Sequence, residues 1–170
     1  MANTPILSLP VASFLDGTES MIVVQGGVDK RIAAQKVAQT LLNTVPGAIE
    51  YVLDGGNIVL NPGMKGFIAV PFNATITSVS VFGDRIGSTA VDIWKCSFAQ
   101  FDGFLTHPSV ADSIVGLNPP VISAGTKYQN MTLSGWTIGL TNGDILAFSV
   151  GSTIAFQKLT VVLNVSRILQ

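Results

Sequence analysis

The sequence predicts a mainly β protein: an antiparallel, jelly-roll-like β-sandwich preceded by an N-terminal arm. From about residue 48 onward, apolar and polar residues alternate, most clearly in residues 75–81 and 159–165, which is the period of a half-buried strand. Turn motifs such as Asn61-Pro62-Gly63 and Asn142-Gly143 separate the alternating runs. No helical period intervenes, and this favours antiparallel strands folded into a sandwich.

The β-domain is expected to span residues 47–170. Between its strands, residues 97–128 contain several prolines and glycines and show no sustained period. A loop of this length in a compact domain is usually functional or packs on a neighbour. The expected strands are residues 49–53, 57–60, 66–70, 75–82, 89–95, 129–133, 144–150 and 156–166.

The N-terminal arm, residues 1–46, has a different pattern. Residues 21–25 form an apolar run that ends at a pair of glycines, which predicts a short strand. Apolar residues then recur at intervals of three and four, including Ile32, Val37 and Leu41. This spacing predicts an amphipathic helix with Asp29 as its N-cap. One strand and one helix cannot bury their own apolar faces, so we expect the arm to dock on its own β-domain or on another chain.

The charge content restricts the classes of function. Only 11% of the 170 residues are charged and the formal net charge is −1, whereas a typical soluble domain has about 25% charged residues. This balance argues against nucleic-acid binding and against attachment to an anionic membrane. No run approaches the roughly 20 apolar residues of a membrane-spanning helix. With 48% hydrophobic residues, either much of the surface lies against partner subunits or the fold has a large β core; we favour the first.

The residue types that carry catalysis are scarce. The only histidine, His107, precedes Pro108 in the long connection, and no nucleophile motif accompanies it. The only cysteine, Cys96, lies at an expected strand end and has no partner for a disulfide or a zinc site. We therefore expect no enzyme activity, no cofactor and no metal site. Calcium bound by Asp102 and Asp112 remains an alternative.

Other carboxylates have an ordinary explanation. Asp84 lies in an expected turn, and Asp92 alternates with the apolar Val91 and Ile93. A pair of carboxylates for glycoside hydrolysis is conceivable among such residues. Because both positions are expected to face water, we interpret Asp84 and Asp92 as solvated surface residues.

Aromatic residues gather around the long connection. Phe98, Phe101 and Phe104 lie within it, and Tyr128 and Trp136 follow. Exposed aromatic faces can stack on sugar rings, which would suit a receptor-binding module. Phenylalanine offers no hydrogen bond for sugar recognition and is enriched in buried interfaces. We therefore favour packing against the sandwich or against a neighbouring subunit.

Two stretches resemble proteins of bacteriophage virions. Residues 6–31, ILSLPVASFLDGTESMIVVQGGVDKR, resemble the opening of many tailed-bacteriophage head- and tail-fibre proteins, in which an "LP-A…LDGTE-VPVVQ-G--K" pattern precedes a helix. The motifs VDIWK (91–95), ADSI (111–114), Pro120, SAGTK (123–127), LSGW (133–136) and GDILAF (143–148) are similar to a β-rich module of phage minor structural and appendage proteins. Together the stretches cover nearly the whole chain.

The resemblance implies a non-enzymatic, trimeric virion component whose arm is the anchor. A single sandwich without a repetitive shaft favours a capsid decoration (cement) protein or a short head fibre over a tail fibre. Its partners would be copies of itself and the major capsid protein, without nucleic acid or membrane. It would be made in the host bacterial cytoplasm and reside on the capsid surface. The alternative is a tail or vertex appendage that binds host-surface glycans.

Candidate contact residues follow from these expectations. The arm is expected to contact the capsid or other subunits through its large apolar residues, and the long connection through its phenylalanines. The arm residues are Leu9, Leu15, Val23, Val24, Ile32, Val37 and Leu41, and the loop residues are Phe98, Phe101 and Phe104.

Overall fold

The computed structural model describes residues 20–33, 45–103 and 105–167. These residues form antiparallel strands and one short 3-10 helix, η2 (Val110–Asp112), so the prediction of a mainly β, antiparallel fold is confirmed. Within these ranges, no helical segment has the length and apolar content needed to cross a bilayer. The chain divides into two compact units, Met1–Asn43 and Thr44–Gln170.

The first unit contains a β-hairpin of β1 (Ser20–Gln25) and β2 (Val28–Ala33). Gly26 and Gly27 both have positive φ, as a two-residue hairpin turn requires. The strand expected at residues 21–25 is therefore confirmed. The helix expected to begin at Asp29 is wrong there, because Asp29 pairs with Val24 in the hairpin. The glycine turn returns the chain beside β1, and cross-strand pairing overrides the helical spacing.

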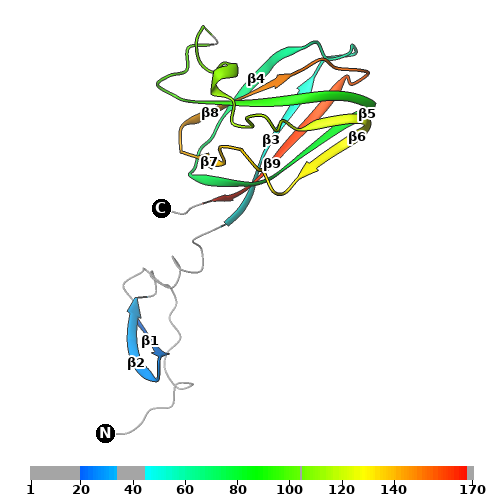
Figure 1. The fold of residues 1–170 in the computed structure, drawn as a ribbon. Coiled ribbons are helices and arrows are strands. Elements are labelled where there is room, and N and C mark those ends of the chain that lie inside the picture. The colour runs from blue at the N-terminus through cyan, green and yellow to red at the C-terminus, as the bar shows by residue number, and fades with distance from the viewer. Residues whose placement is uncertain (1–19, 34–44, 104, 168–170) are drawn as a thin grey trace, which may run out of the picture. The chain divides into compact units, whose positions relative to one another are not determined.

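The second unit is a curled antiparallel sheet (Figure 1). Its strands run in the order β3-β9-β5-β8-β4, and β6 and β7 also pair with β5. The bounds are β3 (Val45–Asp54), β4 (Gly63–Ala69), β5 (Ala74–Ser97), β6 (Val121–Asn130), β7 (Gly139–Leu140), β8 (Asp144–Val150) and β9 (Lys158–Arg167).

The long strand β5 gives the sheet its curl. Its first half pairs with β9 and its second half with β8, while β6 pairs with both halves. The two strands expected at residues 75–82 and 89–95 are thus one, and the turn expected at Gly83 is a bend within it. A Cβ added to Gly83 would lie 2.2 Å from a ring carbon of Phe156, and one added to Gly87 would lie 2.2 Å from the Ile154 carbonyl oxygen. Glycine therefore lets the strand bend closely over Phe156.

Two further expectations need correction. Residues 57–60 are not a strand, and Leu60 instead donates its backbone N–H to the Phe156 carbonyl. The strand expected at 129–133 is β6, which begins at Val121 and ends at Asn130. Most β6 residues are exposed or half-buried, so the strand lacks the apolar alternation by which a strand is recognised in sequence. The connection after β5 is therefore shorter than expected; we call residues 98–120 the long loop.

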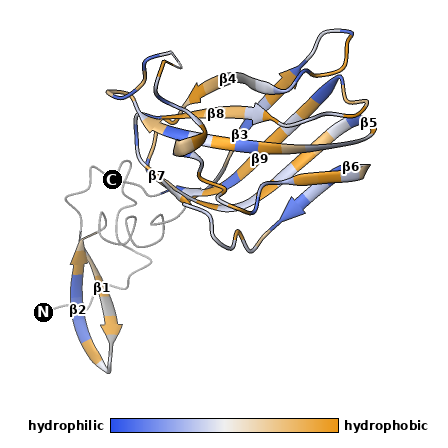
Figure 2. Cartoon of the chain, turned by 45° about the horizontal axis from the view of Figure 1, so that its top comes forward, coloured by the Kyte–Doolittle hydropathy of each residue, from blue (hydrophilic) through white to orange (hydrophobic). Residues whose placement is uncertain are grey.

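The core fills the inside of the curled sheet. The ring of Tyr51 on β3 stacks on Phe148 on β8, with centroids 4.7 Å apart and planes 8° from parallel, so strands far apart in the sheet order face one another. Apolar residues lie along most strands of the curled sheet (Figure 2). The largest fully buried side chains are Phe148, Phe156, Leu53, Ile76, Ile93, Leu146, Leu159, Leu163, Val70, Val79, Val81 and Val91.

Candidate functional site

The long loop is attached to β5 at one point by a carboxylate. Asp92 accepts hydrogen bonds from the Ser113 hydroxyl (2.7 Å) and from the indole N–H of Trp94 (2.7 Å). Beside it, the Ile114 N–H donates to the Ile93 carbonyl (2.9 Å). Asp92 is half-buried, so its interpretation as a solvated residue is wrong. The reason is that residues distant in sequence cover it.

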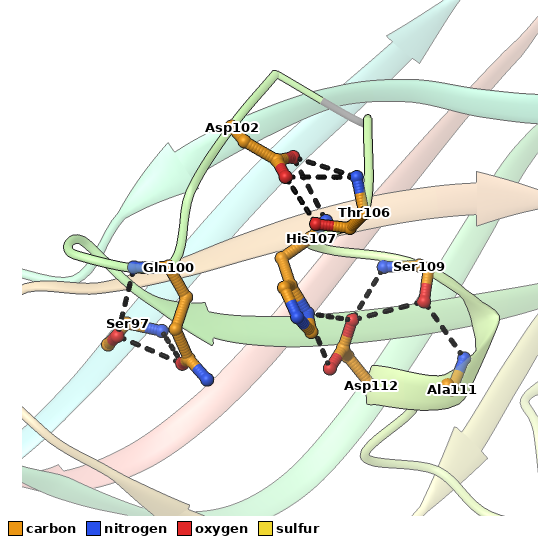
Figure 3. A network of polar contacts seen from close by, with 8 residues as sticks. All are labelled: Ser97, Gln100, Asp102, Thr106, His107, Ser109, Ala111 and Asp112. Atoms are coloured by element: carbon orange, nitrogen blue, oxygen red, sulfur yellow. Dashed lines mark hydrogen bonds and ion pairs between the residues drawn. The ribbon is translucent and has the colours of Figure 1, made fainter.

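A second carboxylate, Asp102, organises the tip of the loop (Figure 3). It accepts hydrogen bonds from the backbone N–H groups of Thr106 and His107, each at 3.0 Å, and from the Thr106 hydroxyl. These donors, the Thr106 hydroxyl foremost, lower the pKa of Asp102 to about 2. The charged carboxylate therefore holds the loop tip closed at neutral pH.

A third carboxylate, Asp112, caps the 3-10 helix η2. It accepts from the Ser109 N–H (2.7 Å), while the Ser109 hydroxyl accepts from the Ala111 N–H (3.3 Å) and contacts Asp112 (3.2 Å), which completes a capping box (Figure 3). The His107 ring nitrogen Nδ1 lies 3.0 Å from Asp112. Burial opposes the shift, but the hydrogen bonds from Ser109 and His107 outweigh it and lower the pKa of Asp112.

The arrangement of these side chains indicates whether the loop could carry out catalysis or bind a metal ion. The Ser109 hydroxyl and the His107 ring both contact Asp112, so the three residues form a cap and not the nucleophile–base–orienter chain of a hydrolase. In the described part of the chain, no group of three or more His, Cys, Asp or Glu residues is placed to hold a metal ion. The carboxylates here fix the backbone of the loop.

Several aliphatic and aromatic side chains of the long loop are exposed to solvent. Phe98 is 76% exposed, Leu105 86% and Leu117 98%, and Val110 is also exposed. On a loop held by many hydrogen bonds, each of these side chains has a fixed backbone position, so little loop entropy would be lost if one of them bound a partner. Binding residues are often found on loops that a rigid scaffold positions, so these side chains are candidates for contact with a partner.

The three phenylalanines expected to act together have different surroundings. Phe98 points to solvent, whereas Phe101 packs edge-to-face on Phe67 of β4, with centroids 4.8 Å apart. Phe101 is thus an anchor of the loop on the sheet. Phe104 lies outside the described residues.

Sequence reasoning did not select Leu105, Val110 or Leu117. In a segment without a hydrophobic period, the sequence gives no sign of which aliphatic residues are exposed. The usable signal was their position among glycines, prolines and threonines, residue types that favour surface loops.

The arm residues are described only in part. Val24 is exposed, as are the neighbouring Ile22 and Val28, and Ile32 is half-buried. Val23 lies in β1. The proposed contacts of all these residues with other chains stay predictions. Leu9, Leu15, Val37 and Leu41 lie outside the described residues.

The other two aromatic candidates also differ. Trp136 is 8% exposed and donates its indole N–H to the Asn118 carbonyl (3.0 Å), so its ring face is not offered to a sugar. Tyr128 is half-buried and lines a surface cavity. Of these two aromatic candidates, Tyr128 is therefore the one available to a ligand.

Cys96 is a buried residue at the end of β5. Burial, followed by the negative charges of Asp112, Asp102 and Asp144, raises the pKa of its thiol. Lys95, its neighbour in sequence, instead pairs with Asp144 at 3.2 Å. The thiol is thus kept in its protonated, unreactive form.

No protein-family model and no curated protein sequence matches this chain. Its function is therefore inferred from the surfaces described above. Two features stand out: the exposed apolar side chains of the long loop, and the cavity beside Tyr128.

Proposed function

We propose that this chain is a non-enzymatic structural protein of a tailed-bacteriophage virion. Its role would be that of a homotrimeric capsid decoration (cement) protein or short head fibre, with the curled sheet as a jelly-roll-like body. The observation that carries the proposal is the long loop, in which hydrogen bonds to Asp92, Asp102 and Asp112 fix the backbone. A fixed backbone that carries the exposed Phe98 and Leu105 is suited to docking.

Simple energetics support a docking role. Fully burying a side chain such as phenylalanine or leucine contributes about 1.5–3 kcal/mol. The exposed residues of one loop would thus contribute several kcal/mol per copy, and a shell contains many copies. A cement protein stabilises a capsid through such repeated contacts, without a chemical step.

The N-terminal hairpin supports the proposal independently. Ile22, Val24 and Val28 are exposed on the two-stranded sheet of β1 and β2, and a two-stranded hairpin by itself is at best marginally stable in water. A partner surface that covers these residues would stabilise the hairpin. In the proposed role that surface belongs to the major capsid protein or to a second copy of this chain.

Copy number in purified mature virions tests the proposal. Quantitative mass spectrometry against the major capsid protein would give comparable abundance for a decoration protein covering the shell. A handful of copies would instead favour the alternative, a tail or vertex appendage that binds host-surface glycans. Absence from virions would overturn both.

A matched pair of variants tests the docking surface itself. Leu105→Ser removes apolar surface from the long loop, whereas Ile154→Ser removes exposed apolar surface far along the chain, between β8 and β9. We expect Leu105→Ser to reduce rebinding to capsids that lack the protein by about tenfold, equivalent to 1.4 kcal/mol. Equal rebinding of both variants and the unaltered protein would exclude the long loop as the docking surface.

A further inference from the structure

A surface cavity of about 300 Å³ lies beside β6. Small-molecule sites are typically about 300–1,000 Å³, so this cavity suits a ligand the size of a monosaccharide or disaccharide. None of its lining residues is charged. They are Leu117, Asn118, Pro119, Val121, Tyr128, Asn130, Thr132 and Ser134.

Hydrogen bonds set the orientation of both amide side chains in the lining. Asn118 donates its Nδ2 to the Ser134 carbonyl at 2.9 Å, which leaves its Oδ1 as an acceptor. Asn130 accepts at Oδ1 from the Thr132 N–H (2.8 Å) and the Leu133 N–H (3.1 Å), which leaves its Nδ2 as a donor. The lining thus presents one fixed acceptor and one fixed donor.

Three hydroxyl groups complete the lining. Within the described residues, the side-chain hydroxyls of Tyr128, Thr132 and Ser134 make no hydrogen bond; the bonds of Thr132 and Ser134 given above are made by their backbones. A hydroxyl can both donate and accept. The cavity therefore combines an aromatic side chain with several hydrogen-bonding groups that are free to bind a ligand.

We propose that this cavity binds a neutral saccharide, with Tyr128 as the aromatic platform. A sugar ring has an apolar C–H face for the tyrosine and hydroxyl groups that pair with amides and with other hydroxyls. The oriented amides select among sugars, because a sugar lacking the matching hydroxyl leaves a polar group unpaired. The site does not depend on the long-loop phenylalanines or on location in a virion.

The charge of the surroundings favours a neutral ligand over an anionic one. Tyr128 also lines a neighbouring cavity of about 380 Å³. Lys127 lines that second cavity but not this one. Nucleic acids are bound through several Lys or Arg contacts to phosphates. A single cation in the adjoining cavity does not provide them.

Binding is tested with the full-length protein by titrating neutral sugars and recording backbone amide NMR shifts. The probes are glucose, galactose, mannose, rhamnose and N-acetylglucosamine with their disaccharides, and a single-stranded oligonucleotide is included. We expect at least one sugar to shift the amides of Tyr128, Asn130 and Thr132. Tyr128→Ala should weaken that binding at least tenfold, whereas Tyr128→Phe, which keeps the ring, should weaken it less.

Two surface variants separate loss of the site from loss of the fold. Thr132→Val removes one exposed hydroxyl of the lining and should weaken sugar binding several-fold, while Lys127→Ala in the neighbouring cavity should leave it unchanged. The proposal is overturned if no neutral sugar shifts these amides, if the oligonucleotide alone does so, or if Tyr128→Ala and Thr132→Val bind as the unaltered protein does. Virion copy number is a separate measurement, so the two proposals fail independently.

Discussion

The Ser113 hydroxyl donates to Asp92 Oδ1 at 2.7 Å, and this bond joins the long loop to β5. The same carboxylate accepts from the Trp94 indole and from the Ile93 N–H. One half-buried side chain thus links a strand of the sheet to a segment about twenty residues later in the chain. Asp102 and Asp112 fix the backbone within the long loop, and the Asp92 carboxylate adds a hydrogen bond that ties the loop to the sheet.

Ser113→Ala should destabilise the protein by about 1–2 kcal/mol. The substitution removes a hydrogen bond to a charged, half-buried acceptor, and such bonds are worth more than neutral ones. Urea unfolding measures the free energy of unfolding, and Ser152→Ala is the control because Ser152 is exposed. If both variants unfold at the same urea concentration, the Asp92 link does not hold the loop.

The bend of β5 supplies a second prediction. Gly83→Ala places a methyl group 2.2 Å from a ring carbon of the fully buried Phe156, so the core must shift. We expect a loss of about 1–3 kcal/mol in the free energy of unfolding. Gly139→Ala is the matched control, since a Cβ there meets nothing within 4 Å. A Gly83→Ala variant as stable as the Gly139→Ala variant would show that the bend tolerates a side chain.

The β character of the second unit could be predicted because several of its strands, such as β3 and β9, alternate between more buried and more exposed residues. β9 alternates buried and half-buried residues along its length, and this pattern is written directly in the sequence. The continuity of β5 could not be predicted. Glycines at positions 83 and 87 signal a turn locally, and only contact with Phe156 shows that they permit a bend.

The N-terminal hairpin and the cavity beside Tyr128 are two further features that the sequence alone predicts only in part. The positions of the apolar residues around Ile32 are compatible with a helix or with a strand. The two-residue turn at Gly26-Gly27 places Ile32 in a strand that pairs with β1. The sequence offers Tyr128 as a candidate sugar-binding residue, but it gives no sign of the cavity partners Asn118 and Asn130. Their roles depend on hydrogen bonds to Ser134, Thr132 and Leu133, and the bond from Asn118 joins segments that local sequence patterns do not connect.

Replacing Phe101 and replacing Phe98 should have different effects on the free energy of unfolding. Phe101→Ala removes an edge-to-face contact with Phe67 and should cost about 1–2 kcal/mol. Phe98→Ala removes a ring that is mostly in solvent and should change the free energy of unfolding by less than about 0.5 kcal/mol. Thermal unfolding of the two variants measures this difference. A larger loss for Phe98→Ala would mean that Phe98 packs on this chain and is not available to a partner.

Acid should release the tip of the long loop through Asp102. Its pKa is about 2 in the folded protein against an ordinary value of 3.8, so the unfolded chain takes up the proton first as the pH falls. The stabilisation is therefore complete above about pH 4 and is lost as the pH falls through 2. An NMR titration of the Asp102 carboxyl carbon should show a midpoint near 2, with parallel shifts of the Thr106 and His107 amides.

The Asp102→Asn variant distinguishes the effect of protonating Asp102 from the effects of protonating other carboxylates. The pKa values of Asp54, Asp84 and Asp112 are also lowered, so acid weakens the whole protein, and the difference between the variant and the unaltered chain isolates Asp102. Asparagine does not titrate, and its single acceptor oxygen cannot replace both carboxylate oxygens. At pH 5 the Thr106 amide hydrogen should therefore exchange faster in the variant than in the unaltered protein. At pH 2, where Asp102 of the unaltered protein is becoming protonated, this difference in exchange rate should become smaller. An Asp102 midpoint near 3.8 in the unaltered protein, with no change in Thr106 exchange in the variant, would mean that this carboxylate does not hold the loop.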